Sequence, residues 1–363
     1  MIPPDYTKIH NRFQLNGFHY TREDLKMVAL SFIKEGDQYE QFMGDFLLDW
    51  LNPSSTIWIE TSGTTSQPKR MKFEKQALIN SALLTGDFFK VGVGDRALHC
   101  LPANFIAGKM MLIRAMFLGF SLDMVSPTSR PMSNLKKKYQ FAAMTPMQAW
   151  NSISRLNQIN TLIVGGGAIS KPLREALLEV KGKVFETYGM TETLSHIAFR
   201  KIDDPIAEFT LLPNFSISQD NRGCMVINAP HLSIENLITN DNVEILNKSK
   251  FRLLGRIDNV INSGGVKIQP EQIEMKLSAD FPPHFFIGAL PNDVLGEELV
   301  LALEKNQDFE IKKLAEVVKK HPKIKKLEQP KAIVLYERFH RTFSGKIKRK
   351  KTLKIPYVER LDL

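Results

Sequence analysis

Apolar residues recur at helical spacing near the start of the chain, and they form two sets that predict two amphipathic helices. The first set predicts a helix over about Arg22–Lys34, and the second predicts a helix that ends before Asn52. The sets are Leu25, Val28, Ala29, Phe32 and Ile33, followed by Phe42, Phe46, Leu47 and Trp50. A β-branched run at Thr56–Ile59 then predicts a strand, and a further helix is expected over about Glu74–Phe89.

In the middle of the chain, short apolar runs alternate with helical patterns. The runs that predict buried strands are Ala97–Leu101, Ser121–Val125, Phe141–Met144, Thr161–Val164 and Val184–Thr187. The helices expected between them are Gly108–Phe117, Pro146–Ile153 and Lys171–Val180. This alternation predicts a largely parallel sheet with helices on its faces. In such sheets functional groups gather in the loops at the carboxyl ends of the strands.

After about Ala207 the pattern changes to short strands separated by polar turns, and beyond Gly255 it becomes a compact α+β pattern. The expected strands are Cys224–Ile227, Val243–Leu246, Phe251–Leu254, Asn259–Ile261, Val266–Ile268, Phe285–Leu290, Leu299–Leu303 and Lys331–Leu335, with helices at Pro270–Leu277 and Ile311–Lys320. The predicted fold class is therefore α/β. A large N-terminal domain (1–255) holds mostly parallel sheets, helices and a small β-rich piece, and a small α+β domain (256–363) follows it.

Composition narrows the functional classes. Hydrophobic residues make up 43% and charged residues 24% of the chain, which is ordinary for a soluble globular protein. The start carries no signal-peptide pattern, and no apolar run is long enough to span a bilayer. Cys100 and Cys224 are too few to suggest a disulfide framework or a zinc site. We therefore expect a cytoplasmic protein without membrane insertion, and the sequence leaves its oligomeric state open.

The net charge of +10 belongs to the C-terminal end, because residues 309–363 contain 17 Lys or Arg and 6 Asp or Glu. Nucleic-acid binding is one explanation for such a basic segment. No aromatic platform or known nucleic-acid module accompanies it, however. We expect instead a solvated basic face, or one that meets a phosphorylated small molecule.

The stretch Thr61–Lys69 is the first candidate for chemistry. Five of its nine residues bear hydroxyls, one is Gly63, and it closes on Pro68 and Lys69. Small residues let successive backbone N–H groups point at an anion, and the lysine supplies a cation. An ordinary Ser/Thr/Gly turn is the alternative, and the spacing is not that of a Walker loop.

Three further stretches carry candidate groups. Gly165–Ala168 follows a predicted strand and would let a flat ligand approach the backbone, although a plain strand-to-helix turn would look alike. Thr187–Thr193 brings an aromatic ring, hydroxyls and the carboxylate of Glu192 to the same sheet edge. Such a carboxylate is usually only solvated, but beside a phosphate site it could hold Mg²⁺. The last stretch is in two parts, Leu254–Gly265 and Arg341–Ile347.

Together these four stretches resemble the adenylate-forming superfamily of acyl-CoA synthetases, luciferases and adenylation domains. That superfamily has a Thr-Ser-Gly-Thr-Thr-Gly-x-Pro-Lys loop, a Tyr-Gly-x-Thr-Glu motif, a Gly-Arg-x-x-Asp region and a terminal Arg-Thr-x-x-Gly-Lys. All four occur here in order between residues 61 and 347. The resemblance implies ATP and Mg²⁺ as cofactors, coenzyme A as co-substrate and a small mobile C-terminal domain.

The resemblance also implies roles for matching residues. Thr61, Ser62, Gly63, Thr64, Thr65 and Lys69 would cradle the β- and γ-phosphates of ATP; Gly166, Gly167, Ala168, Tyr188 and Gly189 would form the adenine site; Thr191 would contact the α-phosphate and Glu192 the metal; Asp241 and Arg256 would hold the ribose. Lys346 would steady the α-phosphate during adenylate formation. Asp258 would be the hinge, and Ser263, Gly264 and Gly265 would replace Lys346 when coenzyme A enters.

Some positions depart from the superfamily pattern. Ser66 stands where the loop usually has Gly, and Asn240 replaces the middle Gly of a Thr-Gly-Asp ribose motif. Phe105 takes the place of a frequent His or Tyr, and His340 precedes Arg341 where Pro is common. None of these changes removes a charged group that the reaction needs, so we expect activity.

Most members have far more residues before the phosphate loop, so the start of the large domain is expected to be abbreviated. The short form, with the stretches Asn104–Met111, Ala143–Gln148 and Tyr188–Ala198, resembles the compact o-succinylbenzoate–CoA ligases of menaquinone biosynthesis. Candidate walls of the acid pocket are then Phe105, Met144 and Gln148, and candidates for the ring carboxylate are Lys109, Arg114, Ser195 and His196. Other aryl- or acyl-CoA ligases, and adenylation enzymes that load a carrier protein, share the same nucleotide motifs.

Overall fold

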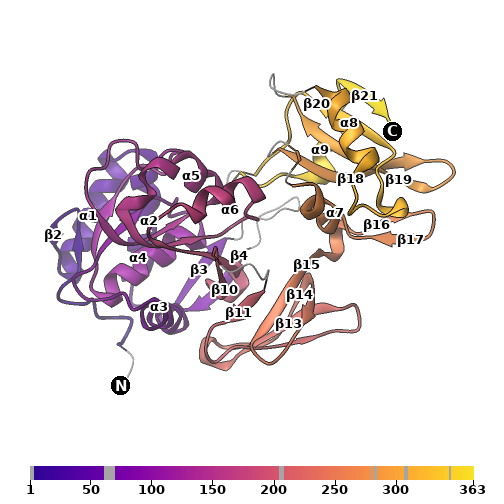
Figure 1. The fold of residues 1–363 in the computed structure, drawn as a ribbon. Helices are drawn as coiled ribbons and strands as arrows, with labels where there is room; N and C mark the ends of the chain where they lie inside the picture. The colour runs from indigo at the N-terminus through magenta and orange to yellow at the C-terminus, as the bar shows by residue number, and fades with distance from the viewer. Residues whose placement is uncertain are drawn as a thin grey trace. The chain divides into compact units, whose positions relative to one another are not determined.

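The computed structural model describes residues 4–60, 70–203, 208–278, 280–281, 284–305, 310–342 and 345–363 (Figure 1). The chain divides into two compact units. The first comprises Met1–Ile169, Ala176–Ser216 and Asn228–Asn236, and the second comprises Ser170–Glu175, Ile217–Ile227 and Leu237–Leu363. The domain boundary expected near residues 255–258 stays a prediction.

The two helices predicted at the start of the chain are confirmed as α1 (Arg22–Glu35) and α2 (Gln38–Leu51). Each begins with a capping box, in which Thr21 and Asp37 are the first partners, so the orphan N–H groups of both helix ends are satisfied. Two short antiparallel strands, β1 (Gln14–Leu15) and β2 (Phe18–His19), precede them.

The predicted parallel sheet is confirmed in the first unit. Its parallel strands are β5 (Arg96–His99), β6 (Ser121–Met124), β7 (Tyr139–Met144), β8 (Ile159–Val164) and β9 (Lys183–Gly189). Their spatial order is β6-β5-β7-β8-β9, with every neighbouring pair parallel. Two antiparallel strands that the sequence did not predict, β10 (His196–Lys201) and β11 (Phe209–Leu211), continue the sheet beyond β9, and β1 adds to β6 at the other edge.

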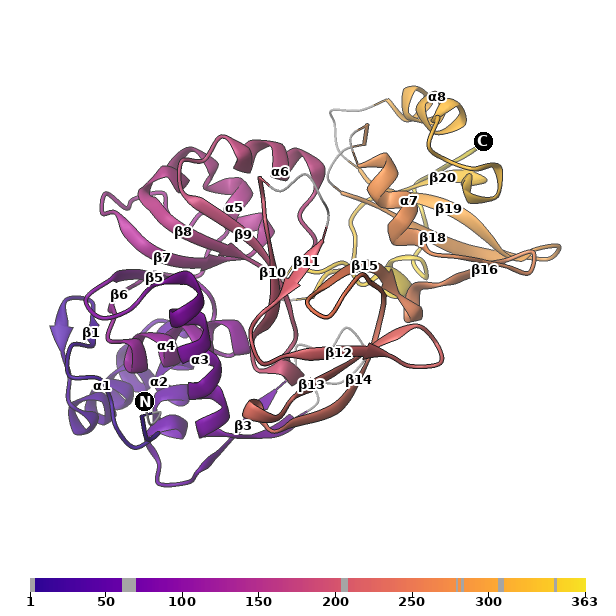
Figure 2. The same cartoon turned by 60° about the horizontal axis from the view of Figure 1, so that its bottom comes forward.

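Helices connect these strands and cover both faces of the sheet. They are α3 (Lys75–Phe89), α4 (Ile106–Leu118), α5 (Pro146–Asn151) and α6 (Lys171–Leu178). Figure 2 shows α3 and α4 on one side of the sheet and α5 on the other. Burial on both faces explains why β7 and β8 each carry four consecutive buried residues at their carboxyl ends rather than an alternating pattern.

An antiparallel pair, β3 (Thr56–Glu60) and β4 (Arg70–Glu74), holds the two ends of the predicted phosphate loop together. Glu60 pairs with Arg70 at the open end of the ladder. The loop itself, with Thr61, Ser62, Gly63, Thr64, Thr65, Ser66 and Lys69, lies outside the described residues.

The strands of the later part of the chain fall into two groups. One contains β12 (Ser216–Gln219), β13 (Cys224–Ala229), β14 (Ile234–Ile245) and β15 (Lys250–Arg256) in that order. The other has the order β17-β16-β19-β20-β21, with β18 also paired to β19. Its strands are β16 (Ile261–Ser263), β17 (Val266–Ile268), β18 (Phe285–Asn292), β19 (Gly296–Glu304), β20 (Ala332–Tyr336) and β21 (Glu359–Asp362).

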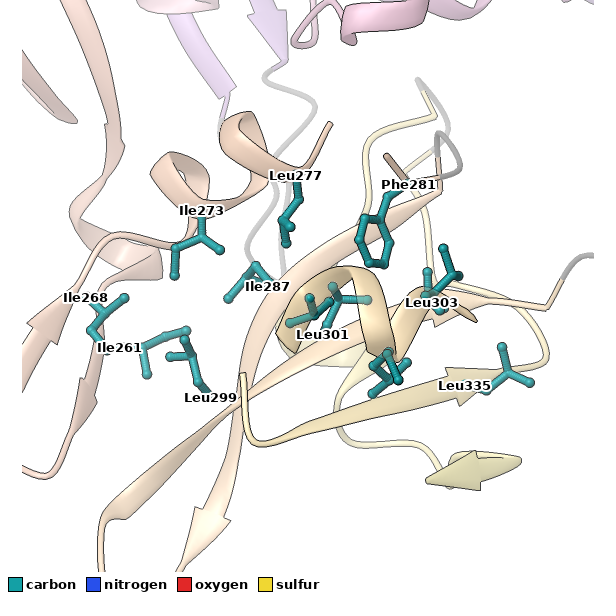
Figure 3. Close-up of a cluster of buried hydrophobic side chains, with 14 residues drawn as sticks. Ile261, Ile268, Ile273, Leu277, Phe281, Ile287, Leu299, Leu301, Leu303 and Leu335 are labelled. Carbon is teal, nitrogen blue, oxygen red and sulfur yellow. The ribbon is translucent and has the colours of Figure 1, made fainter. Parts of the chain in front are cut away.

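The helices α7 (Pro270–Leu277), α8 (Ile311–Lys320) and the short α9 (Arg349–Thr352) accompany this last sheet. Figure 3 shows the core that they share with it, where Ile273 and Leu277 of α7 lie over Ile287, Leu299 and Leu301. All five side chains are almost fully buried, so this core is the main source of cohesion for the C-terminal α+β part.

One predicted strand is wrong in its bounds. Residues Ile257–Asn259 form a 3-10 turn, and the strand begins only at Ile261. The turn is closed by the N–H of Val260, which donates to the carbonyl oxygen of Ile257, and the side chain of Asn259 bonds to Glu271. A short polar side chain with a hydrogen-bond partner nearby favours a turn over a strand. The apolar residues beside Asn259 predicted a strand, but its bond to Glu271 favours the turn.

Across the residues that the structure describes, no helix combines the length and the apolar character that a bilayer span requires.

Candidate functional site

The strand order of the first unit marks where a site belongs. In the strand order β6-β5-β7-β8-β9, β6 lies on one side of β5, and β7, β8 and β9 lie on the other. The topological switch point of the sheet is therefore between β5 and β7. Open parallel sheets bind ligands outside the carboxyl ends of the strands at such a switch point. The loops that leave β5, β7, β8 and β9 therefore form the candidate site.

Gly108 lets the loop after β5 press closely against α4. A Cβ atom at this position would lie 2.2 Å from the carbonyl oxygen of Pro102, so a larger side chain would push the loop away. Phe105 ends this loop in an extended conformation and starts α4. The predicted pocket residue Phe105 is thus placed at the carboxyl edge beside the switch point.

The predicted adenine and phosphate residues lie at the ends of β8 and β9. Gly166, Gly167 and Ala168 follow β8, and the hydroxyl of Thr187 donates to the carbonyl oxygen of Val164 at 3.3 Å, which ties the two strand ends together. Tyr188 is buried, with its ring 6.0 Å from that of Phe209.

Behind Tyr188 lies a support that sequence reasoning missed. The guanidinium of Arg200 lies 4.9 Å from the Phe209 ring and donates to the carboxylate of Glu186 at 2.7 Å. Glu186 and Arg200 are largely buried. Glu186 lies on β9, the strand that carries Tyr188, and Arg200 lies on the neighbouring strand β10. Register in the β9–β10 pair was the only signal for this contact, and β10 was not predicted.

Thr191 and Glu192 sit on a one-turn 3-10 helix, Thr191–Thr193, directly after Gly189 and Met190. The fully buried Thr193 fixes this turn, because its hydroxyl lies within hydrogen-bond distance of the Met190 backbone and donates to the carbonyl oxygen of Ser195 at 2.8 Å. Glu192 is half-buried at the sheet edge. Its single carboxylate fits a Mg²⁺ ion held mostly by nucleotide phosphates, since that metal needs only one or two protein carboxylates.

Arg114, Ser195 and His196 form a hydrogen-bonded chain, although the first is far from the others in sequence. Nη2 of Arg114 donates to Oγ of Ser195 at 2.6 Å, and that hydroxyl lies 3.3 Å from Nδ1 of His196. Arg114 is 2% exposed and His196 is 7% exposed. The His196 ring also packs edge-on against Phe89, with 5.8 Å between centroids.

The charges of the hydrogen-bonded residues Arg114 and His196 follow from their burial. Burial lowers the pKa of Arg114 to about 9, which still leaves the guanidinium charged at neutral pH. Burial, together with the nearby Arg114 charge, lowers the pKa of His196 to about 3, so its imidazole is neutral. The Ser195 hydroxyl accepts from Arg114, and the direction of its bond to Nδ1 of His196 depends on the histidine tautomer. In the tautomer with the proton on Nε2, the hydroxyl donates to Nδ1.

Two buried nitrogen atoms of Arg114 and His196 lack hydrogen-bond partners among the described residues. Within the described residues, neither Nε of Arg114 nor Nε2 of His196 has a hydrogen-bond partner, and both atoms are buried. Besides its bond to Ser195, the guanidinium makes a weak contact from Nη1 to Sδ of Met111 at 3.8 Å. A buried cation and a buried N–H without acceptors are costly unless an anionic acceptor completes them.

The other predicted pocket residues have different surroundings. Nζ of Lys109 lies 4.9 Å from the Phe46 ring of α2; burial lowers its pKa to about 8, against the opposing pull of Asp49, Asp45 and Glu60. The Gln148 amide donates to the carbonyl oxygens of Cys100 and Thr128 at 2.7 and 3.0 Å, so it ties loops together. Met144 is 2% exposed at the end of β7. The structure thus brings Arg114, Ser195 and His196 together but leaves Lys109 and Gln148 outside this chain.

The predicted ribose and hinge residues lie together in the second unit. Asp241 of β14 faces Arg256 of β15 across the antiparallel ladder, and Nη1 of Arg256 donates to Asp241 at 3.0 Å. Nη2 of the same guanidinium donates to Asp258 at 2.8 Å. Ser263, Gly264 and Gly265 form the turn between β16 and β17, and both glycines have positive φ angles.

Lys346 lies in a short loop of the second unit and its side chain is exposed. The backbone of this loop is pinned by Thr342, whose N–H donates to the Lys346 carbonyl oxygen at 2.8 Å and whose hydroxyl accepts from the Lys346 N–H at 3.0 Å. At its base, both terminal nitrogens of Arg341 donate to the carboxylate of Glu304. Burial raises the pKa of Glu304, but the hydrogen bonds from Arg341 and Phe339 outweigh it and lower the value overall.

Comparison with known proteins gives these positions a context. Residues 52–213 match the family of AMP-binding enzymes. A solved acyl-CoA synthetase (AMP-forming)/AMP-acid ligase II-like protein from Dyadobacter fermentans is 31% identical with a TM-score of 0.58, over 91% of this chain and 97% of that one. An o-succinylbenzoate coenzyme A synthetase from Bacillus subtilis, solved with ATP and magnesium, has a TM-score of 0.71 at 21% identity, over 81% of this chain and 69% of that one.

Among curated proteins, the 2-succinylbenzoate–CoA ligase of Escherichia coli (strain K12) is 26% identical over 287 residues, which cover 74% of this chain and 62% of that enzyme. The corresponding ligase of Haemophilus influenzae is 23% identical over 59% of its length. The match thus spans less than two thirds of these curated relatives. The chain belongs to the superfamily of AMP-binding, adenylate-forming enzymes, as shown by its likeness to the Dyadobacter protein, its match to the AMP-binding family and its mixed α/β fold.

Proposed function

We propose that this chain is an AMP-forming acid–thiol ligase that activates o-succinylbenzoate as an acyl-adenylate and transfers it to coenzyme A. The acid class is supported by the names of its curated relatives, several of which are 2-succinylbenzoate–CoA ligases at 23–26% identity. That acid carries two carboxylates. One reacts, and the second must be recognised by the pocket without reacting.

The observation that carries the proposal is the buried chain of Arg114, Ser195 and His196. Its guanidinium charge has no ion-pair partner in the described part of the chain, and two of its N–H groups lack acceptors. A carboxylate of the substrate would supply both the opposite charge and the missing acceptors. Hydrogen bonds to charged groups are worth about 1.5–3 kcal/mol each, so this contact would select strongly for an acid with a second carboxylate.

The aromatic side chains around His196 suit the ring of such a substrate. Phe89 packs against His196, and its ring also lies 5.0 Å from Phe185 and 6.0 Å from Phe141. These rings hold the imidazole in place and surround the polar chain with apolar material. In that setting a bound carboxylate would exchange water for donors that are already oriented.

The adenylating half of the proposal uses the carboxyl ends of β8 and β9. Gly166–Ala168 and Tyr188 would hold adenine, while Asp241 and Arg256 would hold the ribose. Glu192 would hold Mg²⁺, which when bound neutralises charge on the phosphates. Lys346 and Thr191 would stabilise the charge that develops at the α-phosphate, and Thr61–Lys69 would hold the departing pyrophosphate.

In the first step, a carboxylate oxygen of the acid would form a bond to the α-phosphorus while the bond to pyrophosphate breaks. In the second step, the sulfur of coenzyme A would attack the acyl carbon, and AMP would leave with the electron pair of the broken C–O bond. Ser263, Gly264 and Gly265 would line the path of coenzyme A in this second step, after rotation about Asp258.

A matched pair of acids tests the proposal. o-Succinylbenzoate and 4-oxo-4-phenylbutanoate differ only in the ring carboxylate, so comparing them isolates the second charge. We expect pyrophosphate release and CoA thioester formation with o-succinylbenzoate, and a kcat/KM about 30-fold lower, equivalent to about 2 kcal/mol, with the analogue. Benzoates and fatty acids complete the panel. Equal turnover of these simple acids, with none of o-succinylbenzoate, would contradict the substrate assignment.

A further inference from the structure

The two carboxylates assigned to the ribose and to the hinge are joined by one arginine. Arg256 is the last residue of β15, and Asp258 lies in the 3-10 turn that follows it. The guanidinium donates through one nitrogen to Asp241 and through the other to Asp258. A displacement of Asp258 would remove one of these two contacts of the Arg256 guanidinium.

The side-chain amide of Asn240 also bonds to the carboxylate of Asp258. Its Nδ2 lies 3.2 Å from Oδ1 and 3.2 Å from Oδ2 of Asp258, so the amide is shared between both oxygens. Asn240 precedes Asp241 in β14 and stands where the resembling ribose motif has glycine. A glycine has no side chain that could reach Asp258, so this contact is a property of the present sequence.

The other side of the turn is held by α7 and the residue before it. Gln269 donates through Nε2 to the carbonyl oxygen of Arg256 at 3.1 Å, and Gln272 donates to that of Leu254 at 2.8 Å. Between these carbonyls, Gly255 has a φ of +145°, and a Cβ atom there would lie 2.2 Å from Nε2 of Gln269. Gln269 and Gln272 thus donate to backbone carbonyls at the end of β15, and Asn240 donates to the Asp258 carboxylate in the turn that follows.

We propose that Asn240 is a positioning residue that clasps Asp258 and thereby favours the hinge conformation seen here. The contacts from Asn240 and Arg256 would link the ribose carboxylate Asp241 to the hinge, because a rotation that carries the Asp258 side chain away would break both of them. This proposal rests on the function proposed above, in which the two half-reactions need two hinge conformations. Asp258 and Arg256 are 43% and 45% exposed, so solvent screens the clasp and its effect is a bias rather than a lock.

The experiment compares Asn240→Ala with Asn242→Ala, which makes the same change two residues further along β14. The first readout is hydrogen exchange of the Val260 amide, whose bond to Ile257 closes the hinge turn. We expect exchange about 3- to 10-fold faster in Asn240→Ala than in the wild-type chain or in Asn242→Ala. Asn240→Asp keeps the shape but replaces the donor with a like charge, and it should accelerate exchange at least as much.

The second readout is the ratio of the two half-reactions, adenylate formation and thioester formation from supplied acyl-adenylate. A clasp on the hinge predicts that Asn240→Ala changes this ratio at least threefold, whereas general loosening of the strand would lower both rates alike. Exchange at Val260 within twofold of the Asn242→Ala value, or an unchanged ratio, would overturn the proposal. Exchange needs no turnover, so failure of the substrate assignment would not be mistaken for failure of the clasp.

Discussion

Two arginines of this protein, Arg114 in the first unit and Arg349 in the second, meet opposite surroundings. Arg349 donates to both oxygens of Glu274 at 2.7 and 2.8 Å, and Glu271 lies 3.8 Å away. Arg114 is more deeply buried, yet among the described residues its guanidinium bonds only to a hydroxyl and a thioether sulfur. The charge of Arg349 is balanced by a carboxylate, whereas the described part of the chain places no carboxylate against Arg114.

The difference separates a charge that joins two helices from one that the proposed function would use. Glu274 comes from α7 and Arg349 opens α9, so their pair joins two helices of the C-terminal part. Burial raises the pKa of Glu274, even though Arg349 pulls it down. A buried ion pair is held together mainly because breaking it leaves a lone charge. Among the described residues Arg114 is such a charge, and the proposed binding of an anion would give a reason to keep it.

Arg349→Met gives the largest expected effect on this comparison. The change leaves the partly buried Glu274 without its guanidinium, and it should lower the free energy of unfolding by about 3 kcal/mol. Urea unfolding measures the loss. The double variant Arg349→Met with Glu274→Met removes both charges and should recover much of the stability; a double variant no more stable than the single one would show that the pair is not what destabilises the protein.

Arg114→Met should leave stability unchanged or raise it, because it removes a buried charge that has no carboxylate partner among the described residues. The same variant should lower kcat/KM for o-succinylbenzoate by about 2 kcal/mol, which is about 30-fold, and affect 4-oxo-4-phenylbutanoate much less. Steady-state kinetics with both acids measures the difference. Arg200→Met is the matched control in the same unit, since it removes the guanidinium from Glu186 and should destabilise the fold. Equal losses with both acids would mean that Arg114 does not contact the second carboxylate.

The smallest expected effect concerns His196 and pH. Its pKa is lowered to about 3 in the folded chain, whereas an unfolded histidine titrates near 6.5, so below pH 6.5 the unfolded state binds a proton that the folded state does not. Stability is therefore lost as pH falls from about 6.5 toward 3. Between pH 7 and pH 5.5 His196 should account for about 1 kcal/mol of this loss.

The measurement is urea unfolding of the wild-type chain and of His196→Asn at those two pH values. The variant should lose about 1 kcal/mol less on acidification. His99, whose pKa burial lowers to about 4, keeps its own contribution in both proteins and serves as the internal reference. An identical pH dependence in the two proteins would show that His196 is not held neutral by its surroundings.

Most local elements followed from the sequence, because their cause is local. The apolar spacing of α1 and α2 and the consecutive apolar residues of β7 and β8 reflect which faces are buried. The strand β10 was missed because its first residues, from His196, continue a motif that reads as a loop. Asn259 was predicted to begin a strand but ends the turn Ile257–Asn259, because the spacing of residues does not show side-chain partners such as Glu271.

Among the candidate site residues, the sequence by itself determined which chemical groups are present and which loops carry them. Glycines, hydroxyls, Glu192 and Lys346 occur in an ordered set of motifs whose types match the reaction. It also offered Lys109, Arg114, Ser195 and His196 as candidates for the ring carboxylate, and Gln148 as a wall of the acid pocket. Nothing in their spacing could rank them, because a side chain's partner depends on atoms that are distant along the chain.

Only the tertiary structure made that distinction. Arg114 of α4 donates to Ser195, the residue directly before β10, while Lys109 lies against Phe46 of α2 and Gln148 donates to the loop carbonyls of Cys100 and Thr128. Likewise, Asn240 looked like a loss of glycine until the structure placed its amide on Asp258. Burial and hydrogen-bond satisfaction are properties of the packed molecule, so they decide which of several plausible charges is left for a ligand.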